Sequence, residues 1–127
     1  KAARPDSPVI CFTGDGGFWY HLSEIETAVR WNLNSITIVN NNSSLNQEIG
    51  VNEKAYGGKL SHNHGDLWKF KETNFKNVAE SLGAKGIRVE NPNEISSAIE
   101  EALDSNKPCV IDVVTDMYAF PPKPWLG

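Results

Sequence analysis

The chain has 127 residues, of which 39% are hydrophobic and 22% charged, and its 12 basic and 16 acidic side chains give a formal net charge of -4. This composition is typical of one globular domain and excludes an intrinsically disordered chain. No apolar run approaches the roughly 20 residues that cross a bilayer, and no basic segment of the kind that binds nucleic acid is present. We therefore expect a soluble domain that binds neither membranes nor nucleic acid.

The sequence predicts a single domain over residues 1–127 that is a fragment of a longer, multidomain chain. The chain opens on Lys1 and its one methionine is Met117, so we expect the domain to be truncated at its N-terminus. Cys11 and Cys109 both fall in apolar runs, which favours two buried, reduced thiols over a disulfide or a reactive site. Nothing else indicates an oxidising compartment, and we expect a cytoplasmic location.

Two strands and a helix are predicted in the first third of the chain. Residues 9–13 form a continuous apolar run, typical of a strand buried on both faces of a parallel sheet. Apolar residues at helical spacing then predict an amphipathic helix that ends near Asn32, with Ser23 and Glu26 as a capping box. Residues 36–39 predict a β-branched strand that runs into three asparagines.

Periodicity is lost between Ser43 and about Glu72, and we expect an irregular loop there that is functional or mobile. Gly83 then predicts the end of a helix. The remaining predicted elements are a helix over 75–82, a strand over 86–89, a helix over 95–103 entered at Asn93, a strand over 109–114 and an aromatic, proline-rich tail over 118–125. We expect the tail to pack on this domain or on another.

Strands that alternate with helices predict an α/β fold with a doubly wound, mainly parallel sheet and helices on both faces. Ligands bind such sheets outside the carboxyl ends of the strands. Asp15 and Asn42 lie just past the first two of these ends, and a right-handed crossover would bring them close together. The glycines beside Asp15 allow close approach of the backbone, and the following helix offers free amides and the positive end of its dipole. This combination suits a phosphate.

One carboxylate is too little to hold magnesium alone, because the ion takes six oxygen ligands in near-octahedral geometry. Asp15, the amide oxygen of Asn42, a nearby backbone carbonyl, two diphosphate oxygens and one water would complete that set. The residues alone leave another interpretation open. A Gly-Asp-Gly turn is common, and Asp15 can serve only to cap the next helix.

The run Gly14-Asp15-Gly16, followed 27 residues after Asp15 by Asn42 at the end of an apolar, asparagine-tipped segment, resembles the thiamine diphosphate signature. On this motif, nearly the whole chain resembles the C-terminal, diphosphate-binding domain of the acetolactate synthase-like superfamily. The resemblance implies a thiamine diphosphate-binding fold with thiamine diphosphate and Mg²⁺ as cofactors.

The same resemblance implies roles for single residues. Magnesium would be ligated by the side chains of Asp15 and Asn42 and by the carbonyl of Ser44. The cofactor-binding set would be Gly14, Asp15, Gly16, Gly17 and Asn42, although the family often has serine or alanine where Gly17 stands. No catalytic residue is expected in this fragment, because the activating glutamate belongs to a pyrimidine-binding domain elsewhere in the same chain or in a neighbouring subunit.

By the resemblance, the full-length protein is a transferase or lyase that forms a homodimer or homotetramer. It would make or break carbon–carbon bonds next to the carbonyl of small 2-oxo acids, most like acetolactate synthase. Residues 43–48 depart from the Gly-Met pair of acetolactate synthases, so a 2-oxo acid decarboxylase, an aldehyde lyase or a hydrolase remains an alternative. Two further alternatives are a noncatalytic cofactor-binding or assembly module and a flavodoxin-like nucleotide or flavin binder.

Other candidate residues carry weaker signals. His62 and His64 lack a third metal ligand, and we expect them to be solvated loop residues. His21 could reach a phosphate, although an exposed position at the start of a helix is the simpler expectation. Tyr56 and Trp68 could form a lid over the cofactor, but anchoring of the long loop to the core is the base case.

Overall fold

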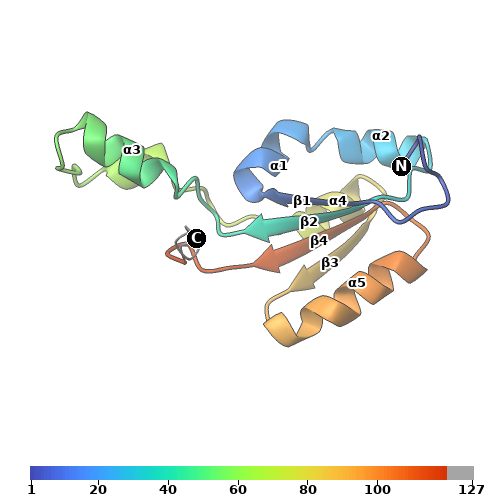
Figure 1. The fold of residues 1–127 in the computed structure, drawn as a ribbon. Helices are drawn as coiled ribbons and strands as arrows, with labels where there is room; N and C mark the ends of the chain where they lie inside the picture. Colours follow the sequence, from blue (N-terminus) through green and yellow to red (C-terminus); the bar gives the residue numbers. More distant parts are fainter. Residues whose placement is uncertain (120–127) are drawn as a thin grey trace, which may run out of the picture.

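A parallel sheet forms the centre of the protein. The computed structural model describes residues 1–119. In this part of the chain the strands lie in the order β1-β2-β4-β3, and every neighbouring pair is parallel (Figure 1). Their bounds are β1 Ile10–Gly14, β2 Ile36–Asn41, β3 Lys85–Val89 and β4 Cys109–Val114.

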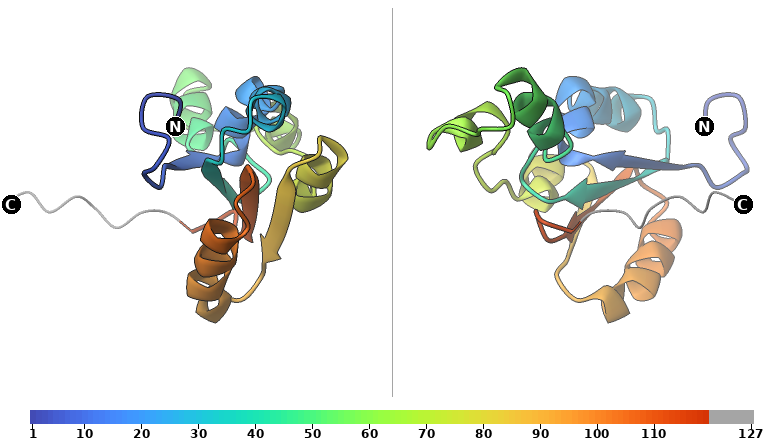
Figure 2. Two further views of the ribbon diagram at one scale, coloured as in Figure 1. Left: turned by 90° about the vertical axis from the view of Figure 1, so that its right-hand side faces the viewer. Right: turned by 60° about the vertical axis from the view of Figure 1, so that its left-hand side comes forward.

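Helices cover both faces of the sheet, because the right-handed crossovers from β1 to β2 and from β3 to β4 run in opposite directions along it. The first face carries α1 (Asp15–His21), α2 (Glu24–Arg30) and α4 (Phe75–Ser81), and the second carries α5 (Ile95–Asp104) (Figures 1 and 2). The doubly wound α/β fold predicted from the sequence is confirmed.

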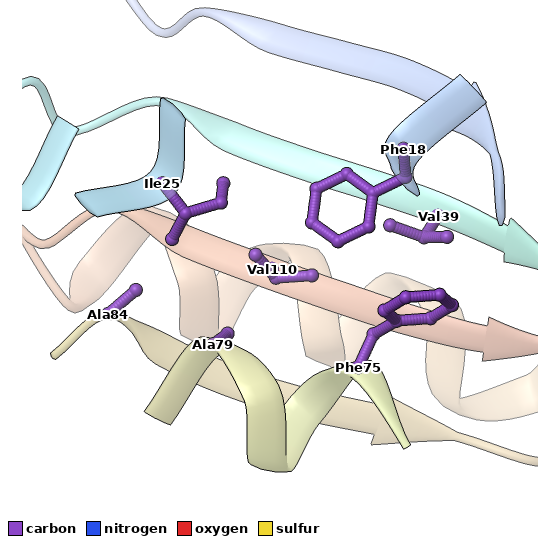
Figure 3. Packing of buried hydrophobic residues seen from close by; sticks show 7 residues of the cluster. All are labelled: Phe18, Ile25, Val39, Phe75, Ala79, Ala84 and Val110. Carbon is purple, nitrogen blue, oxygen red and sulfur yellow. The ribbon is translucent and has the colours of Figure 1, made fainter. Parts of the chain in front are cut away.

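The core under the first face joins α1 to α4 across β2 and β4. Phe18 of α1 meets Phe75 of α4 edge to face, with ring centroids 5.2 Å apart. Figure 3 shows the cluster around them, which consists of Phe18, Ile25, Val39, Phe75, Ala79, Ala84 and Val110. This packing holds the glycine-rich start of α1 at the carboxyl end of β1.

The second core lies under α5. Ala98 and Ala102 let the helix come close to the sheet, and they pack with Ile36, Val89, Cys109 and Ile111. Burial raises the pKa of the Cys109 thiol to about 11, so the thiol is protonated at neutral pH. The prediction of a buried thiol is therefore confirmed for Cys109.

The first strand differs from its prediction. It lies at the edge of the sheet, and α5 packs on β3 and β4 rather than on β1. Phe12 is consequently 72% exposed, and the Cys11 thiol is exposed and free. The predictions of a strand buried on both faces and of a buried Cys11 were wrong for this structure, because a continuous apolar run does not tell an edge strand from a central one.

The long segment after β2 is less irregular than predicted. It contains α3 (Glu48–Ala55) and the short 3-10 helix η1 (His64–Leu67). None of the residues of α3 is buried, and the helix projects away from the sheet (Figure 1). Because α3 packs no apolar stripe on the body of the domain, hydrophobic periodicity could not reveal it.

Helix boundaries also moved. The first predicted helix begins at Asp15 and divides after His21 into α1 and α2, and the side chain of Ser23 makes no capping hydrogen bond. Gly83, with a φ of +88°, ends α4 as predicted. A 3-10 turn, η2 (Pro92–Glu94), precedes α5 and is capped by the Asn91 side chain rather than by Asn93.

Two further sequence expectations concern membranes and the end of the chain. Within residues 1–119, no helix is long and apolar enough to span a membrane. The part of the aromatic tail from residue 120 onward lies outside the described residues, so its predicted packing stays a prediction.

Candidate cofactor site

The register of the first two strands brings the predicted site residues together at the carboxyl ends of those strands. Gly14 lies opposite Asn40 in the parallel β1–β2 pair, so the residues that follow each strand emerge side by side. A cavity of about 240 Å³ opens there. It is lined by all six residues predicted from the sequence, Gly14, Asp15, Gly16, Gly17, Asn42 and Ser44, together with Asn40, Leu45 and Gln47.

Asp15 is the anionic centre of this cavity. Its side chain is buried, with 3% exposure, and accepts hydrogen bonds from the amides of Gly16 (2.8 Å) and Ser44 (3.1 Å). Burial raises the pKa of the Asp15 carboxyl, and the hydrogen bonds from the Gly16 and Ser44 amides oppose that rise. No basic side chain within residues 1–119 forms an ion pair with Asp15. A bound cation would therefore stabilise a carboxylate whose partners in this part of the chain are backbone amides rather than a positive charge.

The donor set beside Asp15 consists of oxygens. The Asn42 side-chain oxygen accepts from the amide and the hydroxyl of Ser44, at 3.1 and 3.0 Å. Within the described residues, no group of three histidine, cysteine or acidic side chains could hold a metal ion. One buried carboxylate and one amide oxygen on the same cavity suit Mg²⁺, which commonly takes its remaining ligands from backbone carbonyls, phosphates and water. The residues present therefore fit a magnesium diphosphate.

The loop that carries Asn42 and Ser44 is tied to a second segment. The Phe70 amide donates to the Ser43 carbonyl (2.8 Å), and the Leu45 amide donates to the Trp68 carbonyl (2.7 Å). Trp68 is 2% exposed. Trp68 thus anchors the long segment to the core, as expected from the sequence, rather than forming a lid.

The glycines of the motif have different steric settings. A Cβ at Gly16 would collide with the Leu45 side chain, and one at Gly17 would lie 2.8 Å from the Thr13 hydroxyl. A side chain at position 17 would therefore require the Thr13 hydroxyl to move. A Cβ at Gly14 would meet no protein atom within 4 Å, and the Gly14 backbone is ordinary. The space beside Gly14 is therefore open to a ligand.

The start of α1 also suits an anion. The N-cap residue Gly14 has no side chain to cap the helix, and of the first-turn amides that of Gly16 is taken by the Asp15 carboxylate. Gly14 and Gly17 both line the cavity at this end of the helix, where the helix dipole favours negative charge.

The remaining candidates lie away from the cavity. His64 accepts a hydrogen bond from the Trp68 indole at 3.1 Å, and His62 is exposed. His21 lines a separate, mainly apolar cavity of about 210 Å³ together with Cys11. Tyr56 is 62% exposed on the projecting segment.

Three lining residues were not predicted from the sequence. Asn40 could have been found, because side chains alternate along a strand and residues 40 and 42 share a side. Leu45 and Gln47 follow the strand in a segment without periodicity, and no sequence signal places them beside Asp15.

These features define a doubly wound α/β domain with an anion-accepting, oxygen-lined cavity at the carboxyl end of its sheet. Residues 1–113 match the family described as thiamine pyrophosphate enzyme, C-terminal TPP binding domain. The chain belongs to this family, and its cofactor is thiamine diphosphate, which is another name for thiamine pyrophosphate. Membership favours this cofactor over the flavin or nucleotide of the flavodoxin-like alternative.

Similar proteins support the same family. A probable acetolactate synthase large subunit from Methanococcus aeolicus is 36% identical over 91% of this chain and 19% of its own length. A 2-hydroxyacyl-CoA lyase from Oryza sativa subsp. japonica is 32% identical over 92% of this chain and 20% of its own length. The chain thus spans about a fifth of the length of these curated relatives.

A solved structure shares the fold. The thiamine diphosphate-dependent 4-hydroxybenzoylformate decarboxylase of Rhodococcus jostii RHA1 superposes with a TM-score of 0.77 at 24% identity. The superposition covers 91% of this chain and 21% of that protein. At this identity the likeness supports the architecture of the domain and not its substrate.

The raised pKa of Asp15 predicts a pH dependence of stability. The folded protein binds the Asp15 proton more tightly than the unfolded chain, whose carboxyl has the ordinary value of 3.8. The stability contributed by Asp15 is therefore complete below pH 3.8 and is lost as the pH rises through the folded-state value. Denaturant unfolding of the cofactor-free protein should show wild type losing free energy of unfolding relative to Asp15→Asn over this interval. A difference that stays constant or grows with pH would contradict the prediction.

Proposed function

We propose that this domain binds the magnesium diphosphate end of thiamine diphosphate within a larger enzyme. The observation that carries the proposal is the convergence of Asp15, Asn42 and Ser44 on one cavity beside the uncapped start of α1. Asp15 and Asn42 ligate Mg²⁺ through their side chains and Ser44 through its carbonyl. The buried carboxylate would supply the negative charge, and the two neutral oxygens would complete the protein's share of the ligands.

The glycine turn orients the diphosphate. The backbone amide of Gly17 donates to a phosphate oxygen, whereas the amide of Gly16 holds the Asp15 carboxylate, and the missing side chain at Gly14 leaves room for the diphosphate. Thiamine diphosphate, when bound, supplies an electron sink for bonds next to a carbonyl group. The residues of this domain hold that group by its diphosphate and leave its reactive ring to be met by other parts of the protein.

The whole protein acts on carbon–carbon bonds next to the carbonyl of a small 2-oxo acid. Similarity to acetolactate synthases supports a synthase-like transfer as the first candidate, and similarity to a 2-hydroxyacyl-CoA lyase supports a lyase as the second. A 2-oxo acid decarboxylase and a hydrolase are further alternatives within the superfamily. A noncatalytic cofactor-binding or assembly module is the alternative outside enzymes.

The domain needs a partner for catalysis. Its relatives are about five times longer than the matched region, which supports a multidomain protein of which residues 1–127 are one part. The activating glutamate comes from a pyrimidine-binding domain, supplied by the same chain or by a neighbouring subunit of a homodimer or homotetramer. The two free cysteines support a reducing, cytoplasmic location.

Removal of the Asp15 carboxylate should abolish metal-dependent cofactor binding. Isothermal titration of the intact protein with thiamine diphosphate should give binding that requires Mg²⁺, and Asp15→Ala should weaken it by at least about 100-fold, because the charged ligand is lost. Asp66→Ala is a matched control, since Asp66 is an exposed acid of η1 outside the cavity. Equal affinity in the Asp15 variant, or magnesium-independent binding by wild type, would refute the assigned ligand set.

The reaction is tested by turnover of pyruvate. The intact protein with Mg²⁺ and thiamine diphosphate should release carbon dioxide from one pyruvate, and a synthase should join the remaining two-carbon unit to the carbonyl carbon of a second pyruvate, which gives acetolactate. Product identification by mass spectrometry separates this outcome from acetaldehyde, the product of simple decarboxylation. Failure to turn over pyruvate, other 2-oxo acids or 2-hydroxyacyl-CoA thioesters would favour the noncatalytic module.

A further inference from the structure

Asn41 lies between two residues of the cofactor cavity but does not line that cavity. Asn40 and Asn42 both face the cavity, whereas Asn41 is buried with 3% exposure. Its amide nitrogen donates to Asp112 Oδ1 at 2.8 Å and to the Thr73 carbonyl at 2.9 Å. Its amide oxygen accepts from the Ser43 amide at 3.3 Å. Asn41 therefore links the interior of the sheet to the loop that follows β2.

Asp112 anchors this link. It lies in the central strand β4 with no exposed surface, and its Oδ2 accepts from Arg88 (2.8 Å) and from the amide of Phe75 (2.9 Å). With Asn41 on Oδ1, both carboxylate oxygens are hydrogen-bonded. Removing a partner from a buried charge is costly, so such a network keeps its members in one arrangement.

Arg88 lies between the buried Asp112 and two exposed glutamates. Its other nitrogens pair with Glu72 at 3.0 Å and Glu90 at 2.9 Å. Its own side chain is 15% exposed, whereas those of the two glutamates are 78% and 69% exposed. The two outer pairs are screened by water and contribute little. Of the three Arg88 ion pairs, only the one with Asp112 involves a direct partner of Asn41.

The other end of the link is a strained residue. Ser43 has a φ of +54°, a left-handed conformation that is unfavourable for residues other than glycine. It stands between Asn42 and Ser44, the two proposed metal ligands. The Asn41 side chain holds the Ser43 amide, and the Phe70 amide holds the Ser43 carbonyl. Strain that persists next to a functional site has to be held by the surrounding structure.

We propose that Asn41 is a positioning residue for the metal site. Asp112 and Arg88 fix Asn41, and Asn41 keeps Ser43 in its left-handed conformation. That conformation directs the Asn42 side chain and the Ser44 backbone to the same cavity as Asp15. This inference rests on the proposed function of that cavity, and it adds a residue that touches neither metal nor cofactor.

Mn²⁺ is the probe for the test, because free and bound Mn²⁺ are distinguished by electron paramagnetic resonance. In the intact protein with thiamine diphosphate, Asn41→Ala should weaken Mn²⁺ binding about 10- to 100-fold, the range of loss on removing groups that hold metal ligands in position. Should Asn41→Ala fail to fold, Asn41→Ser is measured in its place. The added substitution Ser43→Gly should restore part of the affinity, because glycine adopts the left-handed conformation without strain.

Two controls separate positioning from general stability. Glu72→Gln removes an exposed partner of Arg88 and should leave Mn²⁺ affinity unchanged. Ile111→Val trims a buried residue next to Asp112 that packs in the α5 core. It should lower the thermal midpoint without changing Mn²⁺ affinity.

The outcomes distinguish this inference from the function on which it rests. Wild-type affinity in the folded Asn41 variant, or a weakened affinity that Ser43→Gly leaves unimproved, would overturn the positioning role alone. Absence of Mn²⁺ binding by wild type in the presence of thiamine diphosphate would overturn the proposed function and, with it, this inference.

Discussion

Parallel pairing between β1 and β2 sets Gly14 opposite Asn40, and the cofactor cavity depends on this register. Hydrogen bonding between the two strands brings two stretches of chain together at their carboxyl ends, although they are 27 residues apart at Asp15 and Asn42. A shift of one residue would turn the side chains of a strand to the opposite face of the sheet. The core fixes the register, because Val39 has to face Phe18 and Phe75 while Ile36 faces α5.

Two buried carboxylates, Asp112 and Asp15, differ in whether a positively charged side chain pairs with them. Asp112 is compensated by Arg88 and serves the fold. Asp15 has only backbone amides as partners within residues 1–119, and burial raises the pKa of its carboxyl. Such a group lowers the stability of the empty protein and becomes favourable once a cation binds. A buried carboxylate without a cationic partner is what we expect of a cation site. It lowers the free energy of unfolding of the cofactor-free protein, and cation binding offsets that loss.

Core and site share structural elements. Phe75 packs its ring on Phe18 of α1 and donates its amide to Asp112. The first contact holds the helix that begins at Asp15, and the second supports the network that reaches Asn41. Changes in the position of α4 would therefore be felt at both sides of the cavity. The projecting helix α3 has no such connection, since none of its residues is buried.

The sequence was sufficient to predict the fold class from its apolar runs. Six of the nine residues that line the cavity followed from the spaced Gly-Asp-Gly and asparagine motif and from the family resemblance that this motif carries. The sequence was insufficient wherever the answer depends on neighbours in space. The apolar run around Cys11 does not show that β1 is the outermost strand of the sheet. Helix α3 has no apolar stripe from which it could be predicted. Asp112 was a missed signal, since an acid inside an apolar strand is rarely buried without a partner. The identity of that partner, and the role of Asn41, required the structure.

A crystal structure of the intact protein grown with Mg²⁺ and thiamine diphosphate tests the central claim most directly. The account predicts a metal ion about 2.0–2.1 Å from an Asp15 carboxylate oxygen, the Asn42 amide oxygen and the Ser44 carbonyl, with the diphosphate at the start of α1. A diphosphate bound away from this cavity, or a metal held there by none of these three residues, would contradict it.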